Sequence, residues 1–513
     1  MAGHSSPQRL ALAFLSGIVL AASFPKLNLP WLAWAAPGLM LWAARSESGK
    51  SIFMAGVAAG LGNYLVLLYW LLFIPFPFYA VVDYAGMSVV LALCVGAWCR
   101  VCWHLFPTGA GWRGALWPAL CAAAWVAMEM GMTRVLGFPW DSLGVSQFRF
   151  LALIQIASVT GVYGVSFLVA WVSVSVLGIY VSGGRQAAWQ LAPPLAALAG
   201  TVIFGAGKLS EREAEGPVLK VALVQPAIPQ RAIWDPAEKT NRFLKLLELS
   251  RAALAVEPDL LVWPEAALPD LFTRNGYTQR AVAGLLQSHR AWLVMGAADT
   301  RRQRGADGRM ELQGFNSAFL INPGGDLVNR YYKRRLVPFA EYLPLARRFP
   351  YLARLRKSGA GLCAGDRAVL FHLGDRGATL SPLICYEDSF PREARQAAEA
   401  ETDFLLDLTN DGWLGNSAAP WQHAISALFR AVEQGLPLAR CANNGLTCWI
   451  DARGRLHDVY FDGSTDIYQA GFKIAPVPLR AAGQAPTLYR RHGDWFGWGC
   501  VAAVMICLVV CKR

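Results

Sequence analysis

Residues 51–82 read SIFMAGVAAGLGNYLVLLYWLLFIPFPFYAVV and contain no charged side chain. About 20 mostly apolar residues are enough for a helix to cross a bilayer. This stretch therefore predicts a membrane-spanning helix followed by an exit rich in Pro and Phe. A second uncharged stretch, residues 150–184, predicts an interfacial segment followed by a span near 163–182.

Charged residues are distributed unevenly along the chain that contains these stretches. Residues 1–206 hold 9 Lys+Arg and 4 Asp+Glu, which is 13 of the chain's 82 charged residues, and residues 207–513 hold the other 69. Only 16% of the 513 residues are charged, against about 25% in soluble domains. The two parts therefore face different solvents, which excludes a single soluble domain and a disordered or fibrous chain. The length accommodates a membrane bundle and a globular domain.

The apolar segments predict about eight membrane helices. Seven form a transmembrane domain at residues 1–206, and the eighth is a C-terminal transmembrane helix. They are expected at residues 10–24, 30–44, 52–74, 80–99, 114–132, 163–182, 188–206 and 495–511. The first two are short enough to form a tight hairpin. Residues 1–23 also fit a signal peptide, but further spans follow directly, which favours an uncleaved first helix.

Basic residues between the predicted spans set the expected orientation. One side carries Arg9, Arg45, Lys50, Arg100, Arg113, Arg185, Lys512 and Arg513, and the other carries Lys26, Arg134 and Arg149. Because Lys and Arg accumulate on the cytoplasmic side, both termini are expected in the cytoplasm. Residues 207–494 then lie on the outer face. A first segment that was cleaved or did not span would reverse this side.

The net charge of +12 does not indicate nucleic-acid binding, because no Lys/Arg run is interleaved with aromatic residues. A basic surface beside a bilayer fits anionic lipid headgroups better. The 11 cysteines form neither a disulfide framework nor a zinc pattern. We therefore expect no metal, no cofactor and no nucleic-acid partner.

From about residue 217, short apolar runs alternate with helical spacing. Strands are predicted at Val218–Val224, Leu260–Trp263, Ala291–Ala298, Phe315–Ile321, Leu380–Cys385 and Phe404–Leu408, helices at 236–256 and 420–434, and a further apolar segment at Ala439–Ile450. This alternation predicts one α/β domain, placed at residues 217–485. Polar residues collect just after the strands, where α/β folds place their chemistry.

Three of these polar residues have the chemistry of a thiol catalyst. They are Glu265 in WPEAALP, Lys333 in YYKRRLVPFAEYLP and Cys385 in LICYEDSFP. Thiol catalysis needs a base for the thiol proton and donors for the oxyanion. Lys333 would favour the thiolate by its charge, and Glu265 would carry the proton. Each residue alone also fits a structural role, and no local periodicity links the three positions.

Six blocks in the polar part occur in an order that resembles the nitrilase (carbon–nitrogen hydrolase) superfamily. They are VALVQPAIPQ (221–230) followed by Trp234, WPE (263–265), KRRLVPFAEYLP (333–344), ICYED (384–388), NDGWLG (410–415) and NNG (443–445). The chain is most similar to the apolipoprotein N-acyltransferase family, and GFPWDSLGVSQ (137–147) resembles that family's membrane part. The resemblance implies an α-β-β-α nitrilase-like sandwich on the outer face of the membrane.

The resemblance also implies roles for the site residues. Cys385 would be the nucleophile, Glu265 the general base and acid, and Lys333 the partner that fixes geometry and binds the oxyanion. Glu341 resembles a second glutamate that braces this triad, although an ordinary loop carboxylate is the alternative.

Four further residues are implied as supporting or substrate-binding. The backbone N–H groups of Tyr386 and Glu387 would help bind the oxyanion, and Glu387 would orient substrate. Trp234 and Trp413 resemble the family's loop tryptophans, although each also fits a core or interfacial aromatic.

The implied reaction is a two-step acyl transfer in the bacterial inner membrane, with the catalytic domain on the periplasmic face. A phospholipid would acylate Cys385, and the diacylated N-terminal cysteine of an apolipoprotein would accept the chain from the thioester. A monomer is expected. The alternatives are a membrane-tethered nitrilase-type amidase acting on a small amide, a non-catalytic scaffold and a transporter. An amidase acting on a small amide would not need eight spans. An intact triad argues against a non-catalytic scaffold, and the small number of ionisable residues within the spans argues against a transporter.

Overall fold

The computed structural model describes residues 6–107, 112–182, 184–211, 216–304, 310–343, 361–480 and 483–510. The chain divides into two compact units. The helical unit comprises Met1–Glu213, Leu414–Gly435 and Pro486–Arg513, and the sheet unit comprises Ala214–Trp413 and Leu436–Ala485. Among the predicted features, Pro344 and residues 511–513 lie outside the described residues.

In the described part of the helical unit, the regular elements are all helices, joined by loops. They are α1 (Ser6–Ala21), η1 (Pro30–Trp34), α2 (Ala36–Ala44), α3 (Gly49–Leu67), η2 (Tyr69–Phe73), α4 (Pro77–His104), α5 (Trp112–Gly131), η3 (Met132–Leu136), η4 (Leu143–Gln147), α6 (Leu151–Ile154), α7 (Ala157–Thr160), α8 (Val162–Ser182), η5 (Gly184–Leu191), α9 (Ala192–Ser210), α14 (Ala419–Gln434), α15 (Leu488–His492) and α16 (Trp495–Val510).

Five helices in the described part of the chain are long and apolar enough to cross a membrane. They are Gly49–Leu67, Pro77–His104, Gly114–Leu136, Val162–Val181 and Ala188–Ser210. These helices correspond to the third to seventh predicted spans and confirm a multi-span membrane bundle. The other three predicted spans are shorter, at α1, the broken pair η1 and α2, and α16. Whether those three cross the bilayer remains a prediction, and the predicted orientation depends on it.

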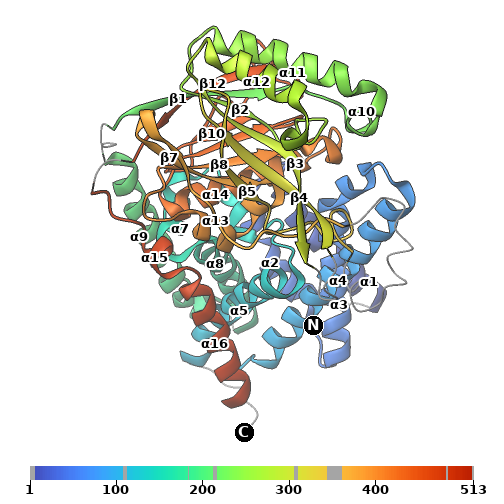
Figure 1. The fold of residues 1–513 in the computed structure, drawn as a ribbon. Coiled ribbons are helices and arrows are strands. Elements are labelled where there is room, and N and C mark those ends of the chain that lie inside the picture. Colours follow the sequence, from blue (N-terminus) through green and yellow to red (C-terminus); the bar gives the residue numbers. More distant parts are fainter. Residues whose placement is uncertain are drawn as a thin grey trace. The chain divides into compact units, whose positions relative to one another are not determined.

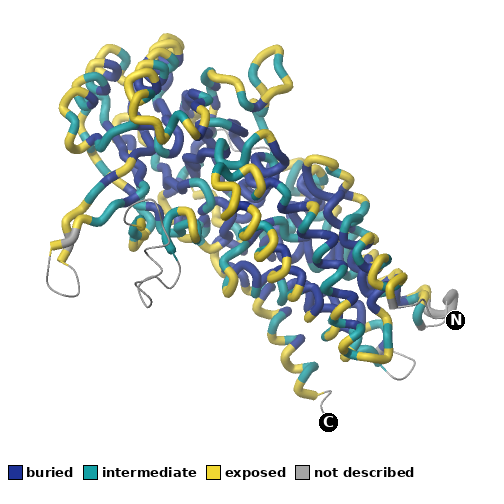
Figure 2. Tube along the Cα trace, turned by 90° about the vertical axis from the view of Figure 1, so that its right-hand side faces the viewer, coloured by how far each residue is buried: buried dark blue, intermediate teal, exposed yellow. Residues whose placement is uncertain are grey.

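Small residues bring the first helices of the bundle close together. A Cβ atom added at Gly17 would lie 1.9 Å from the Ala59 carbonyl oxygen, and one at Gly62 would lie 2.0 Å from the Phe14 carbonyl oxygen. Helices α1 and α3 therefore pack backbone to backbone, as small residues allow in membranes. Figure 2 shows buried residues inside the bundle and exposed residues on its outer surface, α16 included.

Helix α14 follows the NDGWLG loop in the chain but belongs to the helical unit. Its Gln422 accepts a hydrogen bond from Trp140 Nε1 at 2.9 Å, and its Glu433 accepts one from the Val162 N–H at 2.9 Å. The expected 217–485 domain includes this helix. The predicted domain boundaries therefore remain a prediction.

The sheet unit contains two six-stranded sheets, in the orders β12-β1-β2-β3-β4-β5 and β11-β10-β9-β8-β7-β6. The strands are β1 (Val218–Gln225), β2 (Leu260–Trp263), β3 (Trp292–Arg304), β4 (Met310–Ile321), β5 (Leu327–Tyr332), β6 (Phe371–Leu373), β7 (Ala378–Ile384), β8 (Phe404–Thr409), β9 (Leu438–Ala442), β10 (Cys448–Ile450), β11 (Leu456–His457) and β12 (Gly471–Pro478). The central strands β1-β2-β3 and β7-β8-β9 are parallel, and the outer pairs are antiparallel.

Four layers build this unit. The helical segments are α10 (Gln230–Trp234), η6 (Pro236–Glu238), α11 (Lys239–Leu254), η7 (Phe272–Arg274), α12 (Gly276–Gln287), η9 (Gly374–Arg376), η10 (Cys385–Ser389), α13 (Pro391–Ala397) and η11 (Asp411–Leu414). One apolar core lies between the two sheets, and a second lies between the first sheet and α11 and α12 (Figure 1). Helix α13 packs on β7 of the second sheet. The expected α-β-β-α sandwich is confirmed.

The predicted strands correspond to β1, β2, β3, β4, β7 and β8, and Ala439–Ile450 contains the antiparallel pair β9 and β10. Strands β5, β6, β11 and β12 and helix α12 were not predicted. Strand β12 pairs with the whole of β1, yet it contains Lys473 and two prolines and has no strong local strand signal. Its partner lies more than 200 residues earlier in the chain, where local patterns give no information.

Candidate active site

The ends of three strands place the predicted triad. Glu265 lies two residues after β2, Lys333 directly follows β5, and Cys385 directly follows β7. The Lys333 N–H donates to the Asn316 carbonyl at 2.9 Å, which holds the lysine backbone against β4. Both sheets therefore contribute to one site.

Two carboxylates share the ammonium group of Lys333. Its Nζ lies 3.4 Å from Glu265 Oε1 and 3.0 Å from Glu341 Oε1. The Asn316 amide donates to the same two oxygens, at 2.7 Å and 3.0 Å. The Val337 N–H donates to Glu341 Oε2 at 2.8 Å. Glu341 thus lies against Lys333, in the position from which the predicted brace would act.

Burial and charge oppose each other in this cluster. Burial raises the pKa of Glu265 above its ordinary value, and the Lys333 charge only partly offsets this. Burial alone would lower the pKa of Lys333, but Glu341, Glu265 and nearby acidic groups raise it well above its ordinary value. Lys333 therefore remains a cation, while Glu265 keeps its proton to a higher pH than an exposed glutamate does.

Cys385 has an unusual backbone conformation at the turn from β7 into η10. Its φ is +53°, in the left-handed region that side chains other than glycine rarely adopt. Such strain costs about 1–3 kcal/mol and often marks a functional position. The conformation turns the chain sharply at the strand end, directly at the thiol.

The charge of Lys333 lowers the pKa of the Cys385 thiol, as predicted, but other effects on this thiol are larger. Burial, followed by the Glu265 charge, raises the pKa of Cys385 well above its ordinary value, and the lowering by Lys333 is smaller. The thiol is also hydrogen-bonded to the Glu265 carboxylate. The resting nucleophile is therefore a protonated thiol, and the base must take its proton during attack.

Glu387 is fully buried and makes only internal contacts. Its Oε1 accepts from the N–H groups of Arg334 (2.6 Å) and Arg335 (3.0 Å). Its Oε2 accepts from the Ile384 N–H (2.8 Å) and the Tyr331 hydroxyl (2.7 Å). These bonds fasten the turn that carries Cys385 (the nucleophile turn, Cys385–Ser389) to the segment that carries Lys333. The contact of Glu387 with substrate stays a prediction.

Tyr386 occupies the position after the nucleophile and is half-buried. Its ring meets the Phe390 ring edge to face, with 4.9 Å between the centroids. Burial raises the pKa of its hydroxyl above the ordinary value, so the hydroxyl is neutral. This contact packs the two ends of the nucleophile turn together.

The two predicted loop tryptophans lie in contact. The Trp234 and Trp413 rings meet nearly edge to face, with 5.0 Å between their centroids, and Trp234 is 43% exposed. Their loops are joined beneath them, because Asn410 Nδ2 donates to Gln230 Oε1 at 2.8 Å and Asn443 Nδ2 donates to Asn410 Oδ1 at 3.0 Å. A partly exposed aromatic pair thus lies on loops that a buried amide network joins.

Three residues near the triad were not identified from the sequence as functional. Asn316 lies in the middle of β4, where GFNSAFL looks like an ordinary strand. Thr409 ends β8 beside Cys385, since Ile384 pairs with Leu408. The fully buried Thr409 hydroxyl lowers the pKa of the Cys385 thiol, and it has no hydrogen-bond partner of ordinary geometry among the described residues. The sequence signal for Thr409 is weak: it is a polar residue at the end of an apolar strand.

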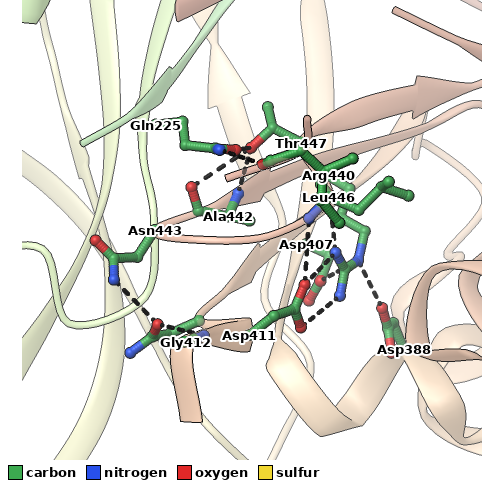
Figure 3. Close-up of polar contacts among 12 residues, drawn as sticks. Gln225, Asp388, Asp407, Asp411, Gly412, Arg440, Ala442, Asn443, Leu446 and Thr447 are labelled. Carbon is green, nitrogen blue, oxygen red and sulfur yellow. Dashed lines mark hydrogen bonds and ion pairs between the residues drawn. The ribbon is translucent and has the colours of Figure 1, made fainter. Parts of the chain in front are cut away.

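The third is Arg440, the centre of what we call the Arg440 cluster: Arg440, Asp388, Asp407 and Asp411 (Figure 3). Its Nη1 lies 3.0 Å from Asp411 Oδ2, and its Nε lies 3.5 Å from both Asp388 Oδ2 and Asp407 Oδ2. Arg440 also donates to the Leu446 carbonyl at 2.8 Å. The cluster joins the nucleophile turn to the loop that carries Trp413.

Comparisons with known proteins give two matching families. The Carbon-nitrogen hydrolase family matches residues 220–470, and the Apolipoprotein N-acyltransferase N-terminal domain matches residues 16–175. An apolipoprotein N-acyltransferase of Geobacter metallireducens is 35% identical, over 98% of this chain and 95% of its own. One of Rickettsia prowazekii is 30% identical, over 95% and 94%.

This chain belongs to the apolipoprotein N-acyltransferase family. Both parts of the chain support this assignment, because one family match falls on the apolar helices and the other falls on the two-sheet domain. A solved amidase of the nitrilase superfamily from Nesterenkonia AN1 is 19% identical over 52% of this chain and 92% of its own, with a TM-score of 0.37. That score is too low to add to the assignment.

Within the described residues, no group of three or more His, Cys, Asp or Glu side chains could hold a metal ion. The apolipoprotein N-acyltransferase site offers two carboxylates, an ammonium group and a thiol. We call Glu265, Lys333, Glu341 and Cys385 the triad cluster below.

Proposed function

We propose that this protein transfers a fatty acyl chain from a membrane phospholipid to the α-amino group of a diacylglyceryl-modified N-terminal cysteine on an apolipoprotein. One observation carries the proposal. A strained, protonated Cys385 lies in hydrogen-bond contact with a carboxylate of raised pKa and beside a buried lysine. This site belongs to a chain whose relatives are named apolipoprotein N-acyltransferases.

In the first step, Glu265 takes the thiol proton while Cys385 Sγ attacks an ester carbonyl of the phospholipid. Lys333 and the N–H groups after Cys385 stabilise the oxyanion. When the tetrahedral intermediate collapses, the C–O bond breaks and Glu265 gives its proton to the leaving lysophospholipid. The acyl chain is then held as a thioester on Cys385.

In the second step, the amine of the acceptor attacks the thioester carbonyl. Glu265 takes a proton from the attacking nitrogen, the C–N bond forms, and the C–S bond breaks. The sulfur recovers its proton from Glu265, which restores the resting thiol. Two displacements through one covalent intermediate predict ping-pong kinetics.

The apolar helices suit this chemistry because both substrates are anchored in lipid. Each methylene moved into water costs about 0.8 kcal/mol, so exposing a chain of a dozen methylenes costs on the order of 10 kcal/mol. A membrane-anchored enzyme avoids that cost. We further infer that the protein lies in a bacterial inner membrane as a monomer, with the sheet unit on the periplasmic side and both termini in the cytoplasm.

The tryptophan pair fits this proposal as part of the lipid-facing surface. Trp234 is exposed beside Trp413, whereas a site for a small polar amide would favour a closed polar pocket. Aromatic side chains are favoured where one end of a group is apolar and the other is wet. We propose that the pair contacts the acyl chains of the substrates.

The test combines the purified full-length protein with a phospholipid and a diacylated lipopeptide. The peptide should gain one acyl mass, and lysophospholipid should appear in equal amount. Free fatty acid released without peptide modification, or turnover of a small amide, would contradict the transferase and support the amidase alternative. Cys363→Ala is the matched control for Cys385→Ala, because Cys363 is also only partly buried.

A further inference from the structure

Three consecutive cations follow β5, at Lys333, Arg334 and Arg335. Lys333 is paired with the two glutamates of the triad cluster. Arg334 is paired with Glu393, 3.0 Å from its Nη1, and donates to Gln396 Oε1 at 2.6 Å and the Tyr331 hydroxyl at 3.2 Å. The first two charges are therefore satisfied inside the protein.

The third cation, Arg335, is held differently. Its guanidinium carbon lies 4.5 Å from the centre of the Phe390 ring. Among the residues that the structure describes, no carboxylate lies within ion-pair distance of this guanidinium and no acceptor receives its side-chain N–H groups. Arg335 is only half-buried. Stacking on a ring face leaves the N–H groups at the guanidinium edge free to bind an anion.

The surroundings place this charge at the nucleophile turn. The backbone N–H of Arg335 donates to Glu387 Oε1 at 3.0 Å, and Phe390 packs against Tyr386, the residue after Cys385. The charge of Arg335 also lowers the pKa of the Tyr386 hydroxyl, against the larger effect of burial. A fixed guanidinium with open donors thus lies next to the turn that carries the attacking sulfur.

The two proposed substrates differ in the anion that such a group would bind. A phospholipid carries a phosphodiester on the same glycerol as the ester that Cys385 attacks. A diacylglyceryl-cysteine carries no phosphate. The planar fork of a guanidinium matches two phosphate oxygens, which a lysine point charge does not.

We propose that Arg335 binds the phosphodiester of the acyl donor and so positions its ester at Cys385. This inference rests on the proposed function. It assigns Arg335 to the first half-reaction only, because the lysophospholipid leaves before the acceptor reacts. Loss of Arg335 should therefore weaken the use of phospholipid and spare both neutral acyl donors and the transfer to the acceptor.

The test measures acylation of Cys385 by intact mass in single-turnover experiments with the full-length protein. Two donors are compared, phosphatidylethanolamine and a neutral p-nitrophenyl ester of the same chain. Arg335→Gln should raise the phospholipid concentration for half-maximal acylation about tenfold, as expected for losing a charge-assisted hydrogen-bonded contact. Arg335→Lys should raise it about threefold, because the charge stays and the fork is lost. Neither should change acylation by the neutral ester.

Arg392→Gln is the matched control, since Arg392 is exposed on the adjacent α13 and its loss removes the same charge. It should leave both donors unchanged. Equal losses of Arg335→Gln on both donors, a loss confined to the lipopeptide step, or a loss shared by Arg392→Gln would each overturn the inference. The lysine variant keeps the test decisive if the glutamine variant does not fold.

The outcomes separate this inference from the proposed function. If phospholipid does not acylate wild-type Cys385, the proposed function fails and the role of Arg335 fails with it. If phospholipid acylates wild type and Arg335→Gln equally well at every concentration, only the role of Arg335 fails.

Discussion

The sheet unit holds two buried charge clusters, and they use their cations differently. In the triad cluster a lysine is shared by two carboxylates, at 3.0 and 3.4 Å, beside a thiol. In the Arg440 cluster an arginine is surrounded by three aspartates and a backbone carbonyl. Both cations are almost completely buried, so burial alone does not distinguish the clusters.

The clusters differ in the number of partners that hold each cation. Two carboxylates hold Lys333, whereas three aspartates and a backbone carbonyl hold Arg440. A guanidinium is planar and fixes its partners in a set geometry, which suits a joint between loops. An ammonium is a compact charge with rotatable donors, which suits a group that must also meet an oxyanion. We infer that the triad cluster performs the chemistry and that the Arg440 cluster holds the loops around it. Four substitutions and the dependence of the rate on pH test this assignment of roles.

The largest effect is expected for Cys385→Ala. Because no other group can form the thioester, acyl transfer should fall about 10⁴-fold or more, and Cys385→Ser should not restore normal turnover. Thermal unfolding should change little. The readout is the mass of the lipopeptide, and Cys363→Ala should retain full activity. Residual transfer near the wild-type rate would remove Cys385 as the nucleophile.

Glu265→Gln should come next, with an acylation rate lowered about 10²- to 10⁴-fold, the range for losing a general base. Amide and carboxylate have similar shapes, and Lys333 keeps Glu341 as a partner, so the fold should persist. Rapid-quench measurement of the acyl adduct tests this. Glu248→Gln removes an exposed carboxylate and should have no effect. An unchanged rate in Glu265→Gln would exclude Glu265 as the base.

The main effect of Arg440→Gln should be a lower free energy of unfolding. Removing one partner leaves buried aspartates uncompensated, which costs about 3–5 kcal/mol in the free energy of unfolding. Arg455→Gln is the control, because that arginine is 37% exposed and solvent screens its ion pair with Asp451; it should cost below about 1 kcal/mol. Unchanged unfolding of Arg440→Gln together with lost activity would mean that the Arg440 cluster is part of the chemistry.

The effect of pH on the acylation rate should be smaller than the effects of these substitutions. A base acts only when deprotonated, and burial raises the pKa of Glu265, so its active form appears at a higher pH than an ordinary glutamate allows. The acylation rate should rise with pH, up to about tenfold per unit, until that raised pKa is passed. Glu265→Gln should remove the rise. A rise in the acylation rate that is centred on the ordinary pKa of a glutamate would contradict the role of Glu265 as the base.

The smallest effect is expected for Thr409→Val. This substitution removes the hydroxyl that favours the thiolate of Cys385. One hydrogen bond is worth about 1 kcal/mol, so acylation should slow about fivefold, and Thr409→Ser should restore most of the rate. A loss equal in the valine and serine variants would instead indicate a packing role.

The sequence predicted the parts that have local signals. Uncharged runs located the membrane helices, and the ordered blocks that resemble the nitrilase superfamily identified Glu265, Lys333 and Cys385. Arg440 and Asn316 have no such signal, because their partners come from distant segments. The protonated state of Cys385 could not be predicted from the sequence, since the burial that outweighs Lys333 depends on the packing of both sheets. The association of α14 with the helical unit depends on contacts such as Trp140 with Gln422, 282 residues apart.

The central claim is that Cys385 carries the acyl chain between two lipid-anchored substrates. Intact-mass measurement of the full-length protein with phospholipid alone tests it most directly. Wild type should gain one acyl mass at Cys385, Cys385→Ala should gain none, and addition of a diacylated lipopeptide should move that mass from the enzyme to the peptide. Peptide acylation by the Cys385→Ala variant, or an acyl mass that water removes but the peptide does not accept, would contradict it.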